Sequence, residues 1–278
     1  AVVEDNEGLW LAKFNRQDSV RVNGGELRCR LVGEGGNLGF TQLGRIEYAL
    51  GGGLIFTDAI DNSAGVDCSD HEVNIKILLA GVVKAGELTS KQRNELLASM
   101  TDEVGELVLD NNKAQTLALE MARRQAGPMA NVHARYIDQL EVEGWLDRAI
   151  EYLPSDKQIA ERQSADLGLT VPEMAVLIAY TKNANTAEVA KTDLVDAPVL
   201  VDDLVAYFPQ PLRERYRGAI EAHPLRREII ATVVSNQMVN LSGISFDHRM
   251  SEDTGVTVVD VTRAWLVARE GFDLVELW

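Results

Sequence analysis

The fold is decided by two apolar stretches joined through glycine-rich sequence, Leu27-Arg-Cys-Arg-Leu-Val-Gly-Glu-Gly-Gly-Asn-Leu-Gly39 and Leu54-Ile-Phe-Thr-Asp58. Leu27–Val32 and Leu54–Phe56 predict buried strands that end in polar turns. Thr41–Leu50 predicts a short helix between them. Strand, loop, helix and strand make the smallest βαβ unit, so we expect parallel pairing with a right-handed crossover. Two strands alone are not a stable sheet, so they either complete a larger sheet or pack on their own helices.

Glycine becomes sparse after about residue 72, and the sequence then takes on the pattern of amphipathic helices. Thr89-Ser-Lys-Gln92 and Thr170-Val-Pro-Glu173 are capping boxes that begin helices. We therefore expect a predominantly helical second part. Its predicted helices are Asp70–Ala85, Lys91–Ser99, Thr101–Gln125, Ala130–Glu143, Leu146–Tyr152, Asp156–Asp166, Val171–Lys182, Asp202–Tyr207, Pro211–Ala222, Leu225–Asn240, Phe246–Glu252 and Val258–Glu270.

Composition limits the partners of the chain. Its 278 residues carry 27 Lys+Arg against 43 Asp+Glu, a net charge of −16. This acidity argues against nucleic-acid and anionic-membrane partners, because both reward clustered basic side chains. No apolar run approaches the roughly 20 residues of a membrane-spanning helix. Two cysteines, Cys29 and Cys68, are too few for a disulfide framework and indicate a reducing cytoplasm.

Two glycine motifs have the approximate spacing of phosphate-binding loops, but neither matches. Gly33-Glu-Gly-Gly-Asn-Leu38 lacks the final glycine of GxGxxG, and Gly39-Phe-Thr-Gln-Leu-Gly-Arg-Ile46 has Arg and Ile where a Walker loop has Lys and Ser or Thr. The simpler interpretation is a tight turn whose backbone lies close to a neighbour. That neighbour is either the chain itself or a cofactor, since ligands bind at the carboxyl ends of parallel strands.

Residues 67–71 allow two interpretations. Cys68-x-x-His71, flanked by Asp67 and Asp70, is at most half of a zinc site, and no further ligand pair accompanies it, so we expect no metal. The alternative is a helix N-terminus at which the aspartates and Ser69 act as caps. Free backbone N–H groups and the Ser69 hydroxyl at such a helix start would bind a carboxylate.

No other part of the sequence offers a catalytic constellation. A Gly-x-Ser-x-Gly elbow is absent from the sequence. Asp58 and Asp61 are interpreted as turn caps or solvated side chains rather than acid–base groups, and Lys76 as a solvated side chain. Arginines between residues 213 and 227 are interleaved with glutamates, which is typical of a solvated salt-bridged surface.

Three motifs together resemble the large bacterial class of NAD-specific glutamate dehydrogenases. They are Gly33-Glu-Gly-Gly-Asn-Leu-Gly39, Gly44-Arg-Ile-Glu-Tyr48 and the run from Thr57-Asp-Ala-Ile-Asp-Asn-Ser-Ala-Gly-Val66 to Ile77. The resemblance is near-continuous from about Val20 to Leu79, and Leu169–Leu177 and Arg263–Trp278 also look like that class. It implies an α/β remnant of a Rossmann-like parallel sheet in residues 1–87 and a helical C-terminal domain in residues 88–278.

The resemblance also implies site residues. Glu34-Gly-Gly-Asn37 and Asn62-Ser-Ala-Gly-Val66 are similar to the cofactor-binding segments of short glutamate dehydrogenases, and Cys68-Ser-Asp-His-Glu72 to a substrate-binding segment. By that similarity Gly35, Gly36, Asn37 and Asn62 bind NAD, and Ser69 binds the side-chain carboxylate of glutamate. The chain departs from the short enzymes at Leu38 and Phe40, and at Asp70-His71, where those enzymes have an aromatic pair.

The family's catalytic Lys and Asp and its first dinucleotide-binding turn have no counterpart here, so no catalytic residue is expected in this chain. The resemblance implies a piece of a longer, homo-oligomeric cytoplasmic enzyme that converts L-glutamate and NAD to 2-oxoglutarate and ammonia, and a chain that is inactive alone. The alternative is a non-catalytic helical module, regulatory or oligomerising, with structural glycine loops.

Overall fold

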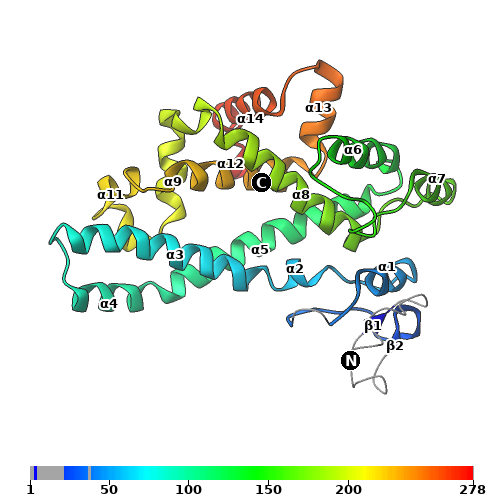
Figure 1. Cartoon of the computed structure of the whole chain (residues 1–278), viewed down its shortest axis with the longest axis horizontal. Helices are drawn as coiled ribbons and strands as arrows, with labels where there is room; N and C mark the ends of the chain where they lie inside the picture. Colours follow the sequence, from blue (N-terminus) through cyan, green and yellow to red (C-terminus); the bar gives the residue numbers. More distant parts are fainter. Residues whose placement is uncertain (1–2, 5–21, 37–38, 278) are drawn as a thin grey trace. The chain divides into compact units, whose positions relative to one another are not determined.

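The structure is a computed structural model that describes residues 3–4, 22–36 and 39–277, with side chains described for residues 22–36 and 39–275. Helices make up most of this part of the chain (Figure 1), which confirms the helix-rich architecture. The helices are α1 (Gln42–Leu50), α2 (Asp58–Asp61), α3 (Ser63–Lys84), α4 (Ser90–Ser99), α5 (Thr101–Arg124), α6 (Ala130–Val142), α7 (Asp156–Ser164), α8 (Val171–Ala190), α9 (Val201–Tyr207), α10 (Gln210–Arg213), α11 (Arg217–Glu221), α12 (Arg226–Ser242), α13 (Phe246–Thr254), α14 (Val258–Phe272) and α15 (Leu274–Leu277). Two strands, β1 (Val3–Glu4) and β2 (Val22–Asn23), and the 3-10 helices η3 (Gly24–Glu26), η4 (Asp193–Asp196) and η5 (Pro198–Leu200) complete the described elements.

The chain divides into two compact units. The first contains Ala1–Ser63, Gln115–Thr181 and Gly243–Arg249, and the second contains Ala64–Ala114, Lys182–Ser242 and Met250–Trp278. Each has apolar side chains that are at most 1% exposed. In the first unit these include Leu119, Ile137, Leu140, Met174 and Leu177, and in the second Leu79, Leu200, Leu204, Phe208 and Ile230. The division at residue 87 stays a prediction.

Helix α12 occupies a central place in the second unit. It packs against α9, η4 and α14, and Figure 1 shows it beside α9 and below α14. From Ile229 to Val239 its residues are buried or half-buried except Thr232, and Ile230 and Val234 are 0% exposed. A helix that is buried on several sides carries apolar residues around much of its circumference rather than along one stripe.

Strand-like structure in the first unit is short and parallel. β1 pairs with β2 through Val3↔Val22 and Glu4↔Asn23. A separate, isolated parallel bridge joins Leu31 to Leu54, so the predicted parallel direction is confirmed. The buried strands predicted at Leu27–Val32 and Leu54–Phe56 are wrong, because in these described stretches no strand extends beyond this one bridge. Among the described residues no larger sheet is present. Leu31 is 66% and Leu54 is 38% exposed, as befits a pair without covering neighbours.

Several helices begin where the capping chemistry predicts. The Thr41 hydroxyl accepts the N–H of Gly44 at the start of α1. Reciprocal capping boxes begin α4 at Thr89 and α14 at Thr257. Each box satisfies two backbone N–H groups that the first turn of a helix leaves unpaired.

The helix predicted from Asp70 begins earlier, at Ser63. Gly65 lies within α3, where its carbonyl accepts the Ser69 hydroxyl hydrogen at 3.2 Å. Asp67 and Asp70 do not cap the helix; their carboxylates accept hydrogen bonds from Asn111 and Tyr207. The helix start expected at residues 67–70 is therefore wrong.

Two other segments predicted to be helices do not form a single continuous helix. Leu146–Tyr152 forms turns, because Asp147 Oδ1 accepts the N–H groups of Ala149 and Ile150, and Tyr152 adopts a positive φ of 55° before the proline at residue 154. Pro211–Ala222 breaks into the short helices α10 and α11, with the Arg213 guanidinium folded back onto the Phe208 carbonyl.

Within the described residues no single helix is long and apolar enough to cross a membrane; only α12 and α13, taken together across the break between them, reach that length and hydropathy.

Candidate active site

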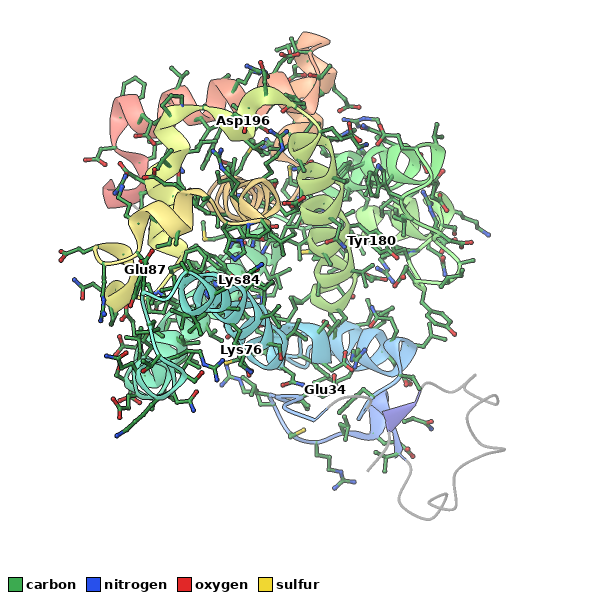
Figure 2. All side chains as sticks on the ribbon, turned by 60° about the vertical axis from the view of Figure 1, so that its left-hand side comes forward. Glu34, Lys76, Lys84, Glu87, Tyr180 and Asp196 are labelled. Carbon is green, nitrogen blue, oxygen red and sulfur yellow. The ribbon has the colours of Figure 1, made fainter. Side chains whose placement is uncertain are left out.

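A buried carboxylate anchors the glycine loop of the first unit, which comprises the described residues Gly33–Gly36 and Gly39–Phe40. Glu34 is 5% exposed and accepts two hydrogen bonds from Arg45 on α1, at 2.6 Å from Nε and 2.9 Å from Nη2. The N–H of Phe40 also donates to Glu34, at 3.1 Å. Figure 2 labels Glu34 on this loop. Because bidentate pairing is the strong form of an Arg–carboxylate contact, Glu34 ties both ends of the loop to α1.

Two aspartates of α2 join this anchor. Asp61 Oδ2 accepts the N–H of Glu34 at 2.7 Å, and Asp58 Oδ1 lies 3.1 Å from Arg45 Nη2. Burial raises the pKa of Asp61, while the hydrogen bond from Glu34 opposes that rise. The turn after Leu31 and the turn after Leu54 therefore meet, as expected for the carboxyl ends of two parallel segments. Asp58 and Asp61 are loop anchors rather than solvated side chains.

Gly35 and Gly36 lie on the exposed side of the loop. A Cβ atom added at either position meets no described atom within 4 Å, and neither residue has a positive φ. Gly53 is the opposite case, since a Cβ there would lie 2.3 Å from the Tyr48 ring. The described fold therefore requires glycine at residue 53 and leaves residues 35 and 36 open to a ligand.

Of the two asparagines predicted to bind the cofactor, the structure describes one. Asn37 lies outside the described residues. Asn62 is half-buried and ends α2, and its N–H donates to the Asp58 carbonyl at 2.8 Å. Asn62 thus belongs to the same turn as Asp61, which holds the glycine loop through Glu34.

Ser69, the predicted substrate-binding residue, belongs to the second unit and lies in the second turn of α3. It is exposed, and its hydroxyl donates to the Gly65 carbonyl. The carboxylate seat expected from free N–H groups at a helix start is therefore absent at Ser69. Only the hydroxyl is available to a ligand, after rotation away from Gly65.

The neighbouring side chains of Cys68 and His71 lie in different environments. Cys68 is a free, exposed thiol, whereas His71 is 2% exposed and stacks on Tyr207 with ring centroids 4.3 Å apart. Burial lowers the pKa of His71, and the nearby Asp67 and Asp70 partly oppose that shift. In the described part of the chain no group of three or more His, Cys, Asp or Glu side chains is arranged to hold a metal ion.

Sequence reasoning missed Arg45. It stands in the failed Walker motif and in Gly44-Arg-Ile-Glu-Tyr48, which carries part of the resemblance, but neither motif gives it a role in the site. The missed signal is the pair of opposite charges on either side of a glycine loop, Glu34 and Arg45, because a buried carboxylate needs a partner. Lys76 is exposed and pairs with Glu72, and Arg217 pairs with Asp202 and Glu221, which confirms the solvated interpretation of these side chains.

Comparison with known proteins gives the family. A model described as "Bacterial NAD-glutamate dehydrogenase, catalytic domain" matches residues 11–122, and one described as "Glutamate dehydrogenase, C-terminal" matches residues 166–278. The chain belongs to the bacterial NAD-glutamate dehydrogenase family. It is 48% identical over 261 residues to an NAD-specific glutamate dehydrogenase of Halomonas elongata and 50% identical over 257 residues to one of Pseudomonas aeruginosa. A relative of the same name from Mycobacterium tuberculosis is 47% identical over 261 residues.

These alignments cover 92–94% of this chain but only 16% of each relative. The chain thus corresponds to about one-sixth of the length of those proteins, as the sequence motifs imply.

Proposed function

We propose that this chain is part of an NAD-specific glutamate dehydrogenase and supplies residues that bind its cofactor and its substrate. The observation that carries the proposal is the match of both family models, together with 47–50% identity to relatives of that name along more than nine-tenths of the chain. The whole protein oxidises L-glutamate with NAD and water, and the products are 2-oxoglutarate, ammonia, NADH and a proton.

The glycine loop binds the dinucleotide. Gly35 and Gly36 present bare backbone on the exposed side of the loop, and the buried Glu34–Arg45 pair keeps that backbone in place. Asn37 and Asn62 contact the nicotinamide–ribose end. When bound, NAD accepts the hydride from the α-carbon of glutamate. The parallel bridge between Leu31 and Leu54 supports a Rossmann-like setting for this loop, completed by strands from the rest of the protein.

Ser69 binds the side-chain carboxylate of glutamate. Its hydroxyl hydrogen leaves the Gly65 carbonyl and turns to a carboxylate oxygen, which is the stronger acceptor because it is charged. Such a hydrogen bond contributes about 1.5–3 kcal/mol. Ser69 therefore acts on glutamate affinity rather than on the cofactor.

We place the catalytic acid and base in other parts of the whole protein, because the family's catalytic Lys and Asp have no counterpart in this sequence. The 278-residue chain alone has no dehydrogenase activity. The whole protein works as a homo-oligomer in the cytoplasm, where the exposed thiols Cys29 and Cys68 stay reduced.

Glutamate-dependent reduction of NAD by the purified full-length protein tests the proposal. We expect NADH, 2-oxoglutarate and ammonia in equal amounts, less activity with aspartate or NADP, and none with the 278-residue chain. Gly35→Val should raise the KM of NAD at least tenfold by filling the open side of the loop, with the glutamate KM unchanged. Absence of glutamate-dependent NADH formation, or an unchanged NAD KM in Gly35→Val, would favour the non-catalytic helical module instead.

A further inference from the structure

A polar cluster in the second unit holds the turn of α3 that carries Ser69. Its centre is Tyr207, the last residue of α9, whose hydroxyl donates to Asp70 Oδ2 at 2.7 Å. The same hydroxyl accepts a hydrogen bond from Asn74 Nδ2 at 2.9 Å. Asn74 Nδ2 also lies 3.3 Å from Asp70 Oδ1, so the three side chains close a ring of hydrogen bonds.

Aromatic stacking also stabilises this turn of α3. The Tyr207 ring lies parallel to His71, with 4.3 Å between centroids and 17° between planes. Asp70, His71 and Asn74 therefore all bind one side chain, and all three follow Ser69 within five residues of α3. His71 and Asn74 are 2% and 4% exposed, which removes water as a competing partner.

His223 fixes the backbone of this turn. Its Nδ1 accepts the N–H of Leu225 at 3.1 Å, so the ring hydrogen is on Nε2. That hydrogen is donated to the main-chain carbonyl of Asn74, at 3.1 Å. Phe208 lies beside both Tyr207 and His223, with ring centroids 5.1 Å and 5.6 Å away.

We propose that Tyr207 is a positioning residue for Ser69, acting through Asp70, His71 and Asn74. On a helix, residues 70, 71 and 74 lie on the side away from residue 69, so holding them fixes the rotation of α3 without covering the Ser69 hydroxyl. This inference rests on the proposed role of Ser69 in glutamate binding. It also accounts for Asp70-His71, where the short glutamate dehydrogenases have an aromatic pair: here Tyr207 supplies the ring from another helix.

The test uses Tyr207→Phe, which keeps the stacked ring and removes both hydroxyl hydrogen bonds. The matched control is Tyr180→Phe, which removes a 2.6 Å hydrogen bond from a tyrosine hydroxyl to Glu151 in the first unit. In Tyr207→Phe we expect the amides of residues 67–78 to exchange hydrogen about tenfold faster than in the native protein, and in the control to exchange at the native rate. Asp70→Asn keeps an acceptor and should give a smaller change.

Kinetics of the full-length protein show whether the effect passes through Ser69. Tyr207→Phe should raise the glutamate KM about five- to tenfold and leave the NAD KM unchanged, and it should cause no further rise in a Ser69→Ala background. If Ser69→Ala raises the glutamate KM and Tyr207→Phe does not, or if the two effects simply add, the positioning role is overturned while the proposed function stands. If Ser69→Ala leaves the glutamate KM unchanged, the proposed role of Ser69 is wrong, and the positioning role falls with it.

Discussion

The glycine-loop region, residues 22–62 apart from the undescribed pair 37–38, and the helical remainder of the chain are stabilised in different ways. In the loop region few of the described apolar side chains are buried, among them Ile46, Tyr48, Ile55 and Ile60, which are 4–7% exposed. Its order depends on one buried ion pair, Glu34 with Arg45, and on the aspartates of α2. The helical remainder is packed around many leucines and isoleucines, and its polar clusters lie within that packing.

This difference indicates what each region is suited for. A loop fixed by ionic contacts can expose bare backbone to a ligand, because no apolar surface has to cover it. A helix fixed by a core and by a few polar contacts can present one side chain in a constant direction. We therefore expect the loop region to depend on charge and the helical remainder on packing, protonation and caps.

The largest expected effect is in the loop region. Arg45→Met leaves Glu34 buried without its counter-charge and should reduce the free energy of unfolding by about 3–5 kcal/mol. The control is Arg124→Met, whose partner Glu120 lies at the surface and whose loss should cost less than about 1 kcal/mol. Urea unfolding of the purified variants measures both. Equal losses would show that the ion pair does not hold the loop.

The second-largest expected effect is on the pH dependence of stability, which one buried group in each region shifts in opposite directions. Burial lowers the pKa of His133, on α6, to about 4, so the unfolded chain takes up a proton at a pH where the folded chain does not. Stability is therefore lost as the pH falls from about 6.5 towards 4, by about 3 kcal/mol from this residue. Burial raises the pKa of Asp61 in the loop region, so its contribution has the opposite sign, and acidification relieves a cost.

Unfolding free energies measured from pH 7 to 4.5 test this contrast. His133→Phe should flatten the acid loss, and Asp61→Asn should steepen it. A parallel pH dependence in both variants would remove the contrast between the two regions.

A third prediction separates two kinds of glycine in the loop region. Gly53→Ala brings a Cβ to 2.3 Å from the Tyr48 ring and should cost about 1–3 kcal/mol of stability. Gly35→Ala meets no described atom within 4 Å and should change stability by less than about 0.5 kcal/mol. Thermal unfolding of the two variants gives the comparison. A destabilised Gly35→Ala would mean that the fold, rather than a ligand, requires glycine there.

The smallest effect concerns a helix start. Thr257→Ala removes the capping box of α14, in which Thr257 and Asp260 satisfy each other's N–H groups. The expected loss is about 1 kcal/mol. Thr254→Ala, which removes only a hydroxyl bond to the Met250 carbonyl, is the control and should stay near the native stability in the same denaturation assay.

The sequence predicts those features that depend on neighbouring residues. The capping boxes predicted at Thr89 and Thr170 mark real helix starts, and the two apolar stretches pair in parallel at Leu31 and Leu54. Helix ends that depend on distant partners are not predicted. Asp67 and Asp70 are residue types that commonly cap helices. Here their carboxylates accept hydrogen bonds from Asn111 and Tyr207, which are far along the chain. The helix α3 therefore does not begin at these aspartates and extends back to Ser63.

The candidate site likewise contains residues that the sequence predicts and residues that only distant contacts reveal. The resemblance names Gly35, Gly36 and Asn62, and the structure places them on or beside the glycine loop. It does not name Arg45, because the need for a counter-charge appears only when Glu34 is buried. Tyr207 is likewise 138 positions from Ser69, and only the fold brings it to α3.

The most direct test of the central claim is the Michaelis constant of each substrate in full-length Ser69→Ala and Asn62→Ala variants. Loss of one hydrogen bond to a charged group, about 1.5–3 kcal/mol, corresponds to a roughly ten- to hundredfold change. We predict a rise of that size in the glutamate KM of Ser69→Ala with the NAD KM unchanged, and the reverse pattern in Asn62→Ala. Unchanged constants, or equal rises for both substrates in both variants, would contradict the assignment of the glycine loop to NAD and of α3 to glutamate.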